Sequence, residues 1–156
     1  MKKNILLILL TLLICTACGF KIVDRSKIDN IFISEIKTIG DKRVNYKVRN
    51  KLSGISNTQG DKKININLDT KRNKSIKEKN IKNEITKYKV IIEINVKVTD
   101  SNLKNIIEFN VSKDGDYIVG KQHSQTINNE KKIVDLISNL LADEILERLS
   151  LNLNDL

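Results

Sequence analysis

Alternating hydrophobic and polar positions predict two adjacent strands in the second half of the chain. From Tyr88 to Val98 every second residue is apolar, and the positions between them are polar except for Ile91. A period of two is typical of a strand with one buried and one solvent-exposed face. Asp100-Ser101-Asn102 then forms a turn signal, and Leu103, Ile107, Phe109 and Val111 continue as a partner strand. Residues 85–112 are therefore predicted to form a hairpin.

Shorter patterns predict further strands. Ile31 and Ile33 indicate a first strand that is broken at Gly40 and Asp41, and Ile64, Ile66 and Leu68 alternate with polar residues as a half-buried strand. Residues 117–119 favour a short additional strand. The polar stretch 69–86 contains no proline, and it is consistent with either a long flexible connection or an extension of the preceding strand.

A period near four predicts two helices. Val44, Val48 and Leu52 define a short amphipathic helix that starts at Lys42 and ends near Gly54. A longer helix is predicted from Asn129 to Leu149, with Asn128 or Asn129 as its cap. Its apolar stripe comprises Ile133, Leu136, Ile137, Leu140, Leu141, Ile145 and Leu149.

The predicted order β-α-β-β-β-α indicates an α+β fold. Each helix has one apolar stripe to bury and each strand has one apolar face. A two-layer sandwich satisfies both, with the two helices packed on one face of a four-stranded, mostly antiparallel or mixed sheet. The chain shows no internal repeat, and residues 18–156 are expected to form one domain.

The N-terminus has the features of a secretory signal. Lys2 and Lys3 precede an apolar core from Ile5 to Ile14, which is shorter than the ~20 residues that a membrane-spanning helix needs. The sequence Cys15-Thr16-Ala17-Cys18 resembles a bacterial lipobox, in which the last cysteine is acylated and becomes the first mature residue. Residues 1–17 are therefore expected to be a lipoprotein signal peptide, with Cys18 as the lipid anchor.

The resemblance to a lipobox also implies a location. Modification of Cys15 instead of Cys18 would place the bulky Ile14 at a position where small residues are preferred, so Cys18 is the better candidate. The mature chain then keeps no cysteine for a disulfide. In such lipoproteins an aspartate after the cysteine marks retention at the inner membrane. Gly19 in its place favours the outer membrane, with the protein on the periplasmic side.

The positive charge of the chain predicts an anionic partner. Lys and Arg number 28 against 19 Asp and Glu, which gives a formal charge of +9. Nucleic acid, an anionic membrane surface and a phosphorylated glycolipid are all compatible with this charge. Export of a lipid-anchored protein excludes nucleic acid and leaves phosphorylated lipid.

The densest basic run lies between residues 71 and 89. Lys71, Arg72, Lys74 and Lys77 are the candidate anion-binding residues, because ammonium and guanidinium groups form charge-assisted hydrogen bonds with phosphates. Two interpretations remain open. The run is either a binding patch or a solvated loop that reflects a general bias of the sequence towards Ile, Lys and Asn.

Residues suited to catalysis or metal binding are scarce. His123 is the only imidazole and Cys18 the only mature thiol, so neither a Cys/His metal cluster nor a Ser–His–Asp arrangement can be assembled. Asp143, Glu144 and Glu147 are interpreted as a solvated helix face, with Glu144 four residues before Arg148 in the favourable order for an ion pair. We therefore expect no enzyme activity, no metal and no cofactor.

One segment partly matches a nucleotide-binding motif. Residues 115–121 have the glycine and lysine spacing of a P-loop, but Gln122 replaces the Ser or Thr that would contact Mg²⁺. The following polar residues show no helical period that would place a helix N-terminus at the phosphates. A turn at Asp114-Gly115 followed by a short strand is the preferred interpretation.

The order of these features resembles the LPS-assembly lipoprotein LptE family. The resemblance rests on the lipobox cysteine followed by Gly19-Phe20, a first strand, the helix with Val44-Asn45-Tyr46-Lys47-Val48-Arg49-Asn50-Lys51-Leu52, a polar segment before a strong hairpin, and the closing residues 141–149. It spans nearly the whole mature chain. The departures are Cys15 in the lipobox and a low aromatic content of 4%.

Membership of that family would imply a particular function and particular partners. The protein would be an outer-membrane lipoprotein inserted in the lumen of the lipopolysaccharide-insertion β-barrel of the LptD type. It would aid assembly of the barrel and delivery of lipopolysaccharide. The alternative is a pilotin-like or general envelope lipoprotein that binds a segment of a client protein.

Overall fold

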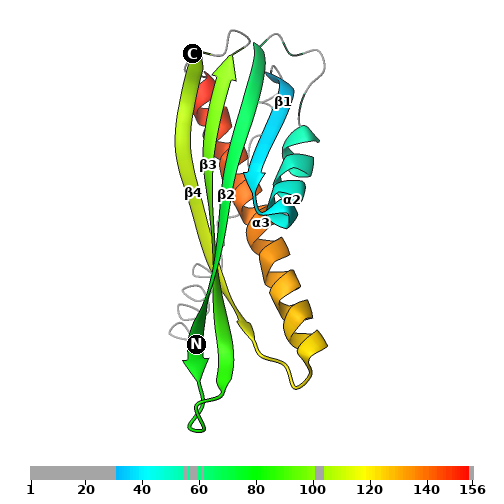
Figure 1. The fold of residues 1–156 in the computed structure, drawn as a ribbon. Helices are drawn as coiled ribbons and strands as arrows, with labels where there is room; N and C mark the ends of the chain where they lie inside the picture. The colour runs from blue at the N-terminus through cyan, green and yellow to red at the C-terminus, as the bar shows by residue number, and fades with distance from the viewer. Residues whose placement is uncertain (1–30, 55, 57–59, 61, 101–103, 155–156) are drawn as a thin grey trace, which may run out of the picture.

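The described residues form two helices and a four-stranded sheet in the order that the sequence predicts. The computed structural model describes residues 31–54, 56, 60, 62–100 and 104–154. The elements are β1 (Ile31–Gly40), α2 (Lys42–Ser53), β2 (Lys62–Lys79), β3 (Ile85–Asp100), β4 (Asn105–Ile118) and α3 (His123–Asn154). Both helices lie on one side of the sheet, so the predicted two-layer α+β architecture is confirmed (Figure 1).

The sheet is mixed, with spatial order β1-β2-β3-β4. β1 runs parallel to β2, whereas β2–β3 and β3–β4 are antiparallel. A parallel pair needs a crossover, and α2 supplies it. Because β1 pairs with β2 only as far as Gly40 opposite Thr70, the second half of β2 extends beyond β1 as part of a long, twisted hairpin (Figure 1).

The core lies between the sheet and the two helices. From Val90 to Val98 of β3, every second side chain is fully buried, as the alternation predicts. The predicted positions Val44, Val48 and Leu52 of α2 are fully buried as well. The remaining buried apolar residues are Ile31, Ile64, Ile66, Leu68, Val111, Tyr117, Val134, Ile137, Leu141, Ala142, Ile145, Leu146 and Leu149.

Local polar contacts fix the junction between β1 and α2. Asp41 is the N-cap of α2, and its carboxylate accepts hydrogen bonds from the backbone N–H groups of Arg43 and Val44, each at 3.0 Å. The buried Asn45 accepts a hydrogen bond of 2.7 Å from the Thr70 hydroxyl and donates one of 3.0 Å to the Ile39 carbonyl. These buried polar groups are therefore satisfied within the fold.

The polar stretch 69–86 is a strand extension, and the alternative of a long flexible connection is wrong. β2 continues to Lys79, and β3 begins at Ile85 after a short turn. In this turn Asn83 has φ 63°, and the side-chain oxygen of Asn80 accepts hydrogen bonds from the N–H groups of Lys82 and Glu84. An asparagine that bonds to the backbone two residues ahead is a common turn device.

Two other predicted boundaries are also wrong. Residues 105–118 form one continuous strand, so there is neither a turn at Asp114-Gly115 nor a separate strand over 117–119. α3 begins at His123, six residues before the predicted start. Gly115 lies within the antiparallel strand β4, opposite Val90. The strand-to-helix geometry of a P-loop is therefore absent at this position.

The predicted apolar stripe of α3 is only partly buried. Ile137, Leu141, Ile145 and Leu149 face the core, but Leu136 and Leu140 are 53% and 47% exposed. The stripe that the sequence predicts is wider than the helix face that the sheet covers.

Candidate anion-binding hairpin

The candidate residues lie on the part of the β2–β3 hairpin that extends beyond β1. We call residues 71–89 the basic hairpin. It carries eight Lys and Arg against Glu78 and Glu84. Strand alternation places Arg72 and Lys74 on the helix-facing side of β2, as continuations of Leu68 and Thr70, and places Lys71 on the opposite face. The four predicted residues therefore do not share one face.

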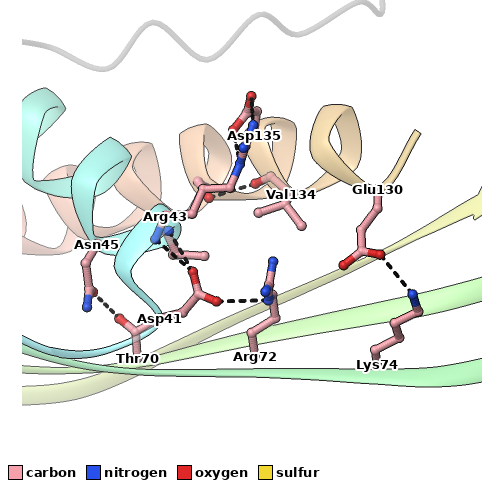
Figure 2. Close-up of polar contacts among 11 residues, drawn as sticks. Asp41, Arg43, Asn45, Thr70, Arg72, Lys74, Glu130, Val134 and Asp135 are labelled. Atoms are coloured by element: carbon pink, nitrogen blue, oxygen red, sulfur yellow. Dashed lines mark hydrogen bonds and ion pairs between the residues drawn. The ribbon is translucent and has the colours of Figure 1, made fainter. Parts of the chain in front are cut away.

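Arg72 is paired with the N-cap residue of α2. Its Nε lies 2.9 Å from the Asp41 Oδ2 (Figure 2). The other oxygen of the same carboxylate caps the helix. The guanidinium therefore links the start of α2 to β2 and is partly neutralised.

Lys74 is the centre of a polar cluster between β2, β4 and α3. Its Nζ lies 2.8 Å from Glu130 Oε2, which also accepts a 2.7 Å hydrogen bond from the Tyr117 hydroxyl. The ammonium group lies 4.2 Å from the centroid of the Tyr88 ring, which stacks on Tyr117. Figure 2 shows Glu130 reaching from α3 toward Lys74.

Burial and hydrogen bonds within this cluster shift the pKa values of its ionisable side chains. Partial burial opposes the charge on Lys74, but hydrogen bonds with Glu130 and Tyr117 outweigh it and raise the lysine pKa. Burial likewise acts against the charged form of Glu130, yet the bonds from Lys74 and Tyr117 lower its pKa. Burial raises the pKa of Tyr117. The lysine and the glutamate are therefore both charged at neutral pH.

The remaining ion pairs of the basic hairpin follow its length. Lys77 binds Asp116, and this hydrogen bond raises the pKa of the lysine. Within the hairpin, Lys87 Nζ is 2.7 Å from the Glu78 carboxylate. Lys89 Nζ is 3.0 Å from Asp114 Oδ2 on β4.

These pairs leave a small excess of charge at the end of the hairpin. The residues 71–89 alone carry a net charge of +6, and the carboxylates of Asp41, Asp114, Asp116 and Glu130 reduce it to +2. Lys71, Lys79 and Lys82 are exposed and form no ion pair with a described residue. Ile81, at the turn between Lys79 and Lys82, is fully exposed. Lys79 and Lys82 therefore lie beside the turn with no carboxylate directly opposite them, whereas Lys71 lies eight residues before Lys79 on β2, opposite Glu93 of β3.

The other sequence candidates lie apart from this hairpin. His123 is exposed at the start of α3. On the same helix the predicted Glu144–Arg148 pair is present at 2.9 Å. Lys113 and Arg148 lower the pKa of Glu144 although burial opposes them, and Asp143 pairs with Lys51 of α2. These carboxylates are engaged in ion pairs.

Two general features of the described residues bear on function. Within them, no cluster of three or more His, Cys, Asp or Glu side chains is arranged to hold a metal ion. None of the helices in the same part of the chain is both long and apolar enough to cross a membrane. Cys18, the predicted anchor, lies outside the described residues.

The fold resembles those of several solved bacterial proteins. Rare lipoprotein B from Shewanella oneidensis superposes with a TM-score of 0.56 at 14% identity, covering 75% of this chain and 94% of that one. A minor lipoprotein from Acinetobacter baumannii gives a TM-score of 0.61 at 11% identity, with coverage of 80% and 93%. The chain shares its fold with these two proteins. A Caulobacter crescentus lipoprotein, with a TM-score of 0.59 at 13% identity and coverage of 84% and 95%, has it too.

Sequence comparison adds nothing to this structural likeness. No protein-family model matches the chain, and no curated protein matches it. At such low identity the solved structures establish the fold alone. The chain spans nearly the whole length of these proteins.

Proposed function

We propose that this protein is an outer-membrane lipoprotein, anchored at Cys18, that acts as plug and assembly partner of the lipopolysaccharide-insertion β-barrel. The observation that carries the proposal is the fold shared with these bacterial lipoproteins, because its strand and helix order is the one on which the resemblance to LptE rests. The lipobox ending at Cys18 supports the anchor. In this role the protein performs no reaction and binds a protein and a phosphorylated glycolipid.

The end of the basic hairpin is the proposed contact for lipopolysaccharide. Lys79 and Lys82 offer ammonium groups to phosphates at the turn, and the exposed Ile81 beside them offers an apolar side chain to the lipid portion. Lys71 adds a further exposed ammonium group nearer the start of the basic hairpin. The paired cations Arg72, Lys74 and Lys77 hold the hairpin against α2, α3 and β4. These three cations attract an external anion less strongly than the unpaired lysines do, because each of them faces a carboxylate.

The register of the sheet separates this hairpin end from the proposed anchor. β1 begins opposite Lys62, at the start of β2, and the turn follows Lys79. At ~3.3 Å per residue, β2 therefore spans about 55–60 Å. The segment 19–30 has a maximal reach of about 40 Å. With β2 perpendicular to the membrane, this reach is too short for the turn to face the leaflet that holds the anchor. The turn therefore points away from that leaflet, toward lipopolysaccharide that has not yet reached the membrane.

A charge-reversal experiment tests this contact. The variant K71E/K79E/K82E breaks no ion pair among the described residues, although it removes the hydrogen bond from Lys79 to Asn83 and places a glutamate opposite Glu93. These changes lie at exposed positions, so we expect the fold to be retained and a loss of binding to report on the anion contact. We expect affinity for lipopolysaccharide to fall at least ten-fold at low salt, and the difference to shrink as salt screens the charges.

The matched control reverses three exposed lysines elsewhere on the protein. Lys63, Lys97 and Lys121 are exposed and form no ion pair with a described residue, so the variant K63E/K97E/K121E carries the same change in net charge. Equal loss of affinity in the two variants would mean that net charge alone attracts the lipid, and no loss in either would assign the basic hairpin to the solvated-loop interpretation.

The alternative function shares the anchor and the fold but differs in the partner. A pilotin-like or general envelope lipoprotein would bind a segment of a client protein, and lipopolysaccharide would not compete with that client. Identification of the stably bound partner therefore separates the two.

A further inference from the structure

β4 forms an open edge of the sheet. It pairs with β3 from Asn105 to Ile118, and no strand among the described residues lies on its other side (Figure 1). The edge of a strand presents a row of backbone N–H and C=O groups that can pair with another extended chain. With 14 residues, β4 is longer than most edge strands.

α3 leaves apolar side chains exposed along its boundary with this edge. One hollow between the two elements is lined by Ile118 of β4 and by Ile133 and Leu136 of α3. A second is lined by Lys113 of β4, by Leu140 and Leu151 of α3, and by the charged side chains of α3 between these two leucines, which are Asp143, Glu144, Glu147 and Arg148. We call this boundary the β4 groove. A fifth strand beside β4 would place its helix-facing side chains near Leu136 and Leu140, extending the two-layer core by one strand.

The opposite face of β4 is acidic. Glu108, Asp114 and Asp116 lie opposite Lys97, Ile91 and Lys89 of β3, on the face that the helices do not cover. Asp114 and Asp116 already pair with lysines of the basic hairpin on the β3 side, so a strand on the other side of β4 would meet these carboxylates from their open edge. The Oδ1 of Asp116 is buried and accepts no hydrogen bond within the described protein. Because opposite charges stabilise directly facing cross-strand pairs, a neighbouring strand with basic residues on this face is favoured.

A second copy of the chain does not meet this requirement. If two β4 edges paired about a two-fold axis with the helices on the same side, Glu108, Asp114 and Asp116 would share one face with the same residues of the other copy. Like charges that face each other across strands are destabilising. The charge pattern thus favours a different chain over self-association.

We propose that the β4 groove binds an extended segment of a partner protein as a fifth strand, with apolar side chains against Leu136 and Leu140 and lysine or arginine opposite the carboxylates of β4. The groove is separate from the basic hairpin end, so this binding does not depend on the lipopolysaccharide contact. Backbone pairing supplies affinity in such strand addition, and alternate side chains supply specificity.

The test uses the full chain in detergent and a synthetic peptide of about ten residues in which valine alternates with lysine. Amide hydrogen exchange, measured with and without the peptide, should show new protection in β4 and none in β1. A peptide with glutamate in place of lysine should bind at least about ten-fold more weakly, because its glutamates would face the carboxylates of β4.

Side-chain variants locate the site. Leu136 and Leu140 are about half exposed, so L136K/L140K should fold normally and weaken binding of the valine–lysine peptide about ten-fold. The control I39K changes an isoleucine of β1 that is 72% exposed. It should leave the affinity within about two-fold.

Four results of the peptide experiments would overturn the proposal. In hydrogen exchange, these are no new amide protection in β4 at peptide concentrations of about 1 mM, or protection of β1 in place of β4. In the binding measurements, they are equal affinity for the glutamate peptide and the lysine peptide, or a loss of affinity in I39K equal to that in L136K/L140K. A concentration-dependent dimer with protected β4 amides in the absence of peptide would also contradict it, because a second copy would then be the occupant.

Discussion

Replacement of Glu130 by glutamine tests whether the Lys74 cluster holds the basic hairpin against α3. Glutamine keeps the size of the side chain and an oxygen that can accept the Tyr117 hydrogen bond, but it removes the charge that faces Lys74 at 2.8 Å. The Lys74 side chain is 40% exposed and that of Glu130 is 25% exposed. Solvent therefore screens the pair, and E130Q should lower the free energy of unfolding by only about 1 kcal/mol.

The difference in unfolding free energy between the wild type and E130Q should depend on pH. The folded protein lowers the pKa of Glu130, so the stabilisation is complete above the unfolded-state pKa of about 4.3 and is lost as the pH falls through the folded-state pKa. In urea titrations, the difference between the wild type and E130Q should be full at pH 7 and should shrink in acid.

A double-mutant cycle assigns the effect to the pair. Combining E130Q with K74Q should give a coupling energy of about 0.5–1 kcal/mol. E108Q, which changes an exposed carboxylate of β4 with no ion pair among the described residues, should alter stability by less than about 0.5 kcal/mol. A coupling energy near zero, or a destabilisation by E130Q that is independent of pH, would refute the assignment.

Two further substitutions test the junction of β1 with α2 and the core. Gly40 has φ 93°, and a Cβ there would lie 1.8 Å from the Thr70 carbonyl oxygen, so thermal unfolding of G40A should show a loss of at least about 2 kcal/mol. G54A is the control, because its Cβ would lie 3.4 Å from the Asn50 carbonyl oxygen, and an equal loss in both would contradict the strain argument. Leu141 is fully buried between α3 and the sheet, so L141A should cost about 2–5 kcal/mol in urea unfolding, whereas L140A, at a half-exposed position, should cost under about half as much. Equal costs would mean that α3 is rotated about its axis relative to the orientation described.

The sequence was sufficient to predict the fold class because its strongest patterns coincide with the core. The alternation from Tyr88 to Val98 and the four-residue period of Val44, Val48 and Leu52 both correspond to burial. The extension of β2 past Thr70 was harder to predict, because the side chains of residues 71–79 are all exposed and show no alternation. Pairing with β3, and not a buried face, keeps this segment extended.

The sequence could not show which of the basic residues form ion pairs. Lys74 and Glu130 are 56 positions apart, and Lys77 and Asp116 are 39 apart. No local pattern links such residues. The register of β2, β3 and β4 and the path of α3 bring them together, and they convert most of a basic run into internal ion pairs. The sequence identified the cations but not the acidic side chains that neutralise them.

The sequence also could not show which positions of the apolar stripe of α3 are buried. Leu136 and Leu140 fit the helical period as well as the buried Ile137 and Leu141 do. A period identifies a helix face but not how many strands lie beneath it. With four strands present, the stripe extends past β4, and only the structure separates covered from uncovered positions.

Co-purification from outer membranes tests the proposed function most directly. A tagged full-length chain would be expressed in its own cell type, the membranes solubilised in mild detergent, and stably bound proteins identified after size-exclusion chromatography. We expect a stoichiometric complex with the lipopolysaccharide-insertion β-barrel that persists in the variant K71E/K79E/K82E, because the hairpin end binds lipid and not the barrel. Recovery of the chain as a monomer, or in a stable complex with a secretion pore, would contradict the proposal.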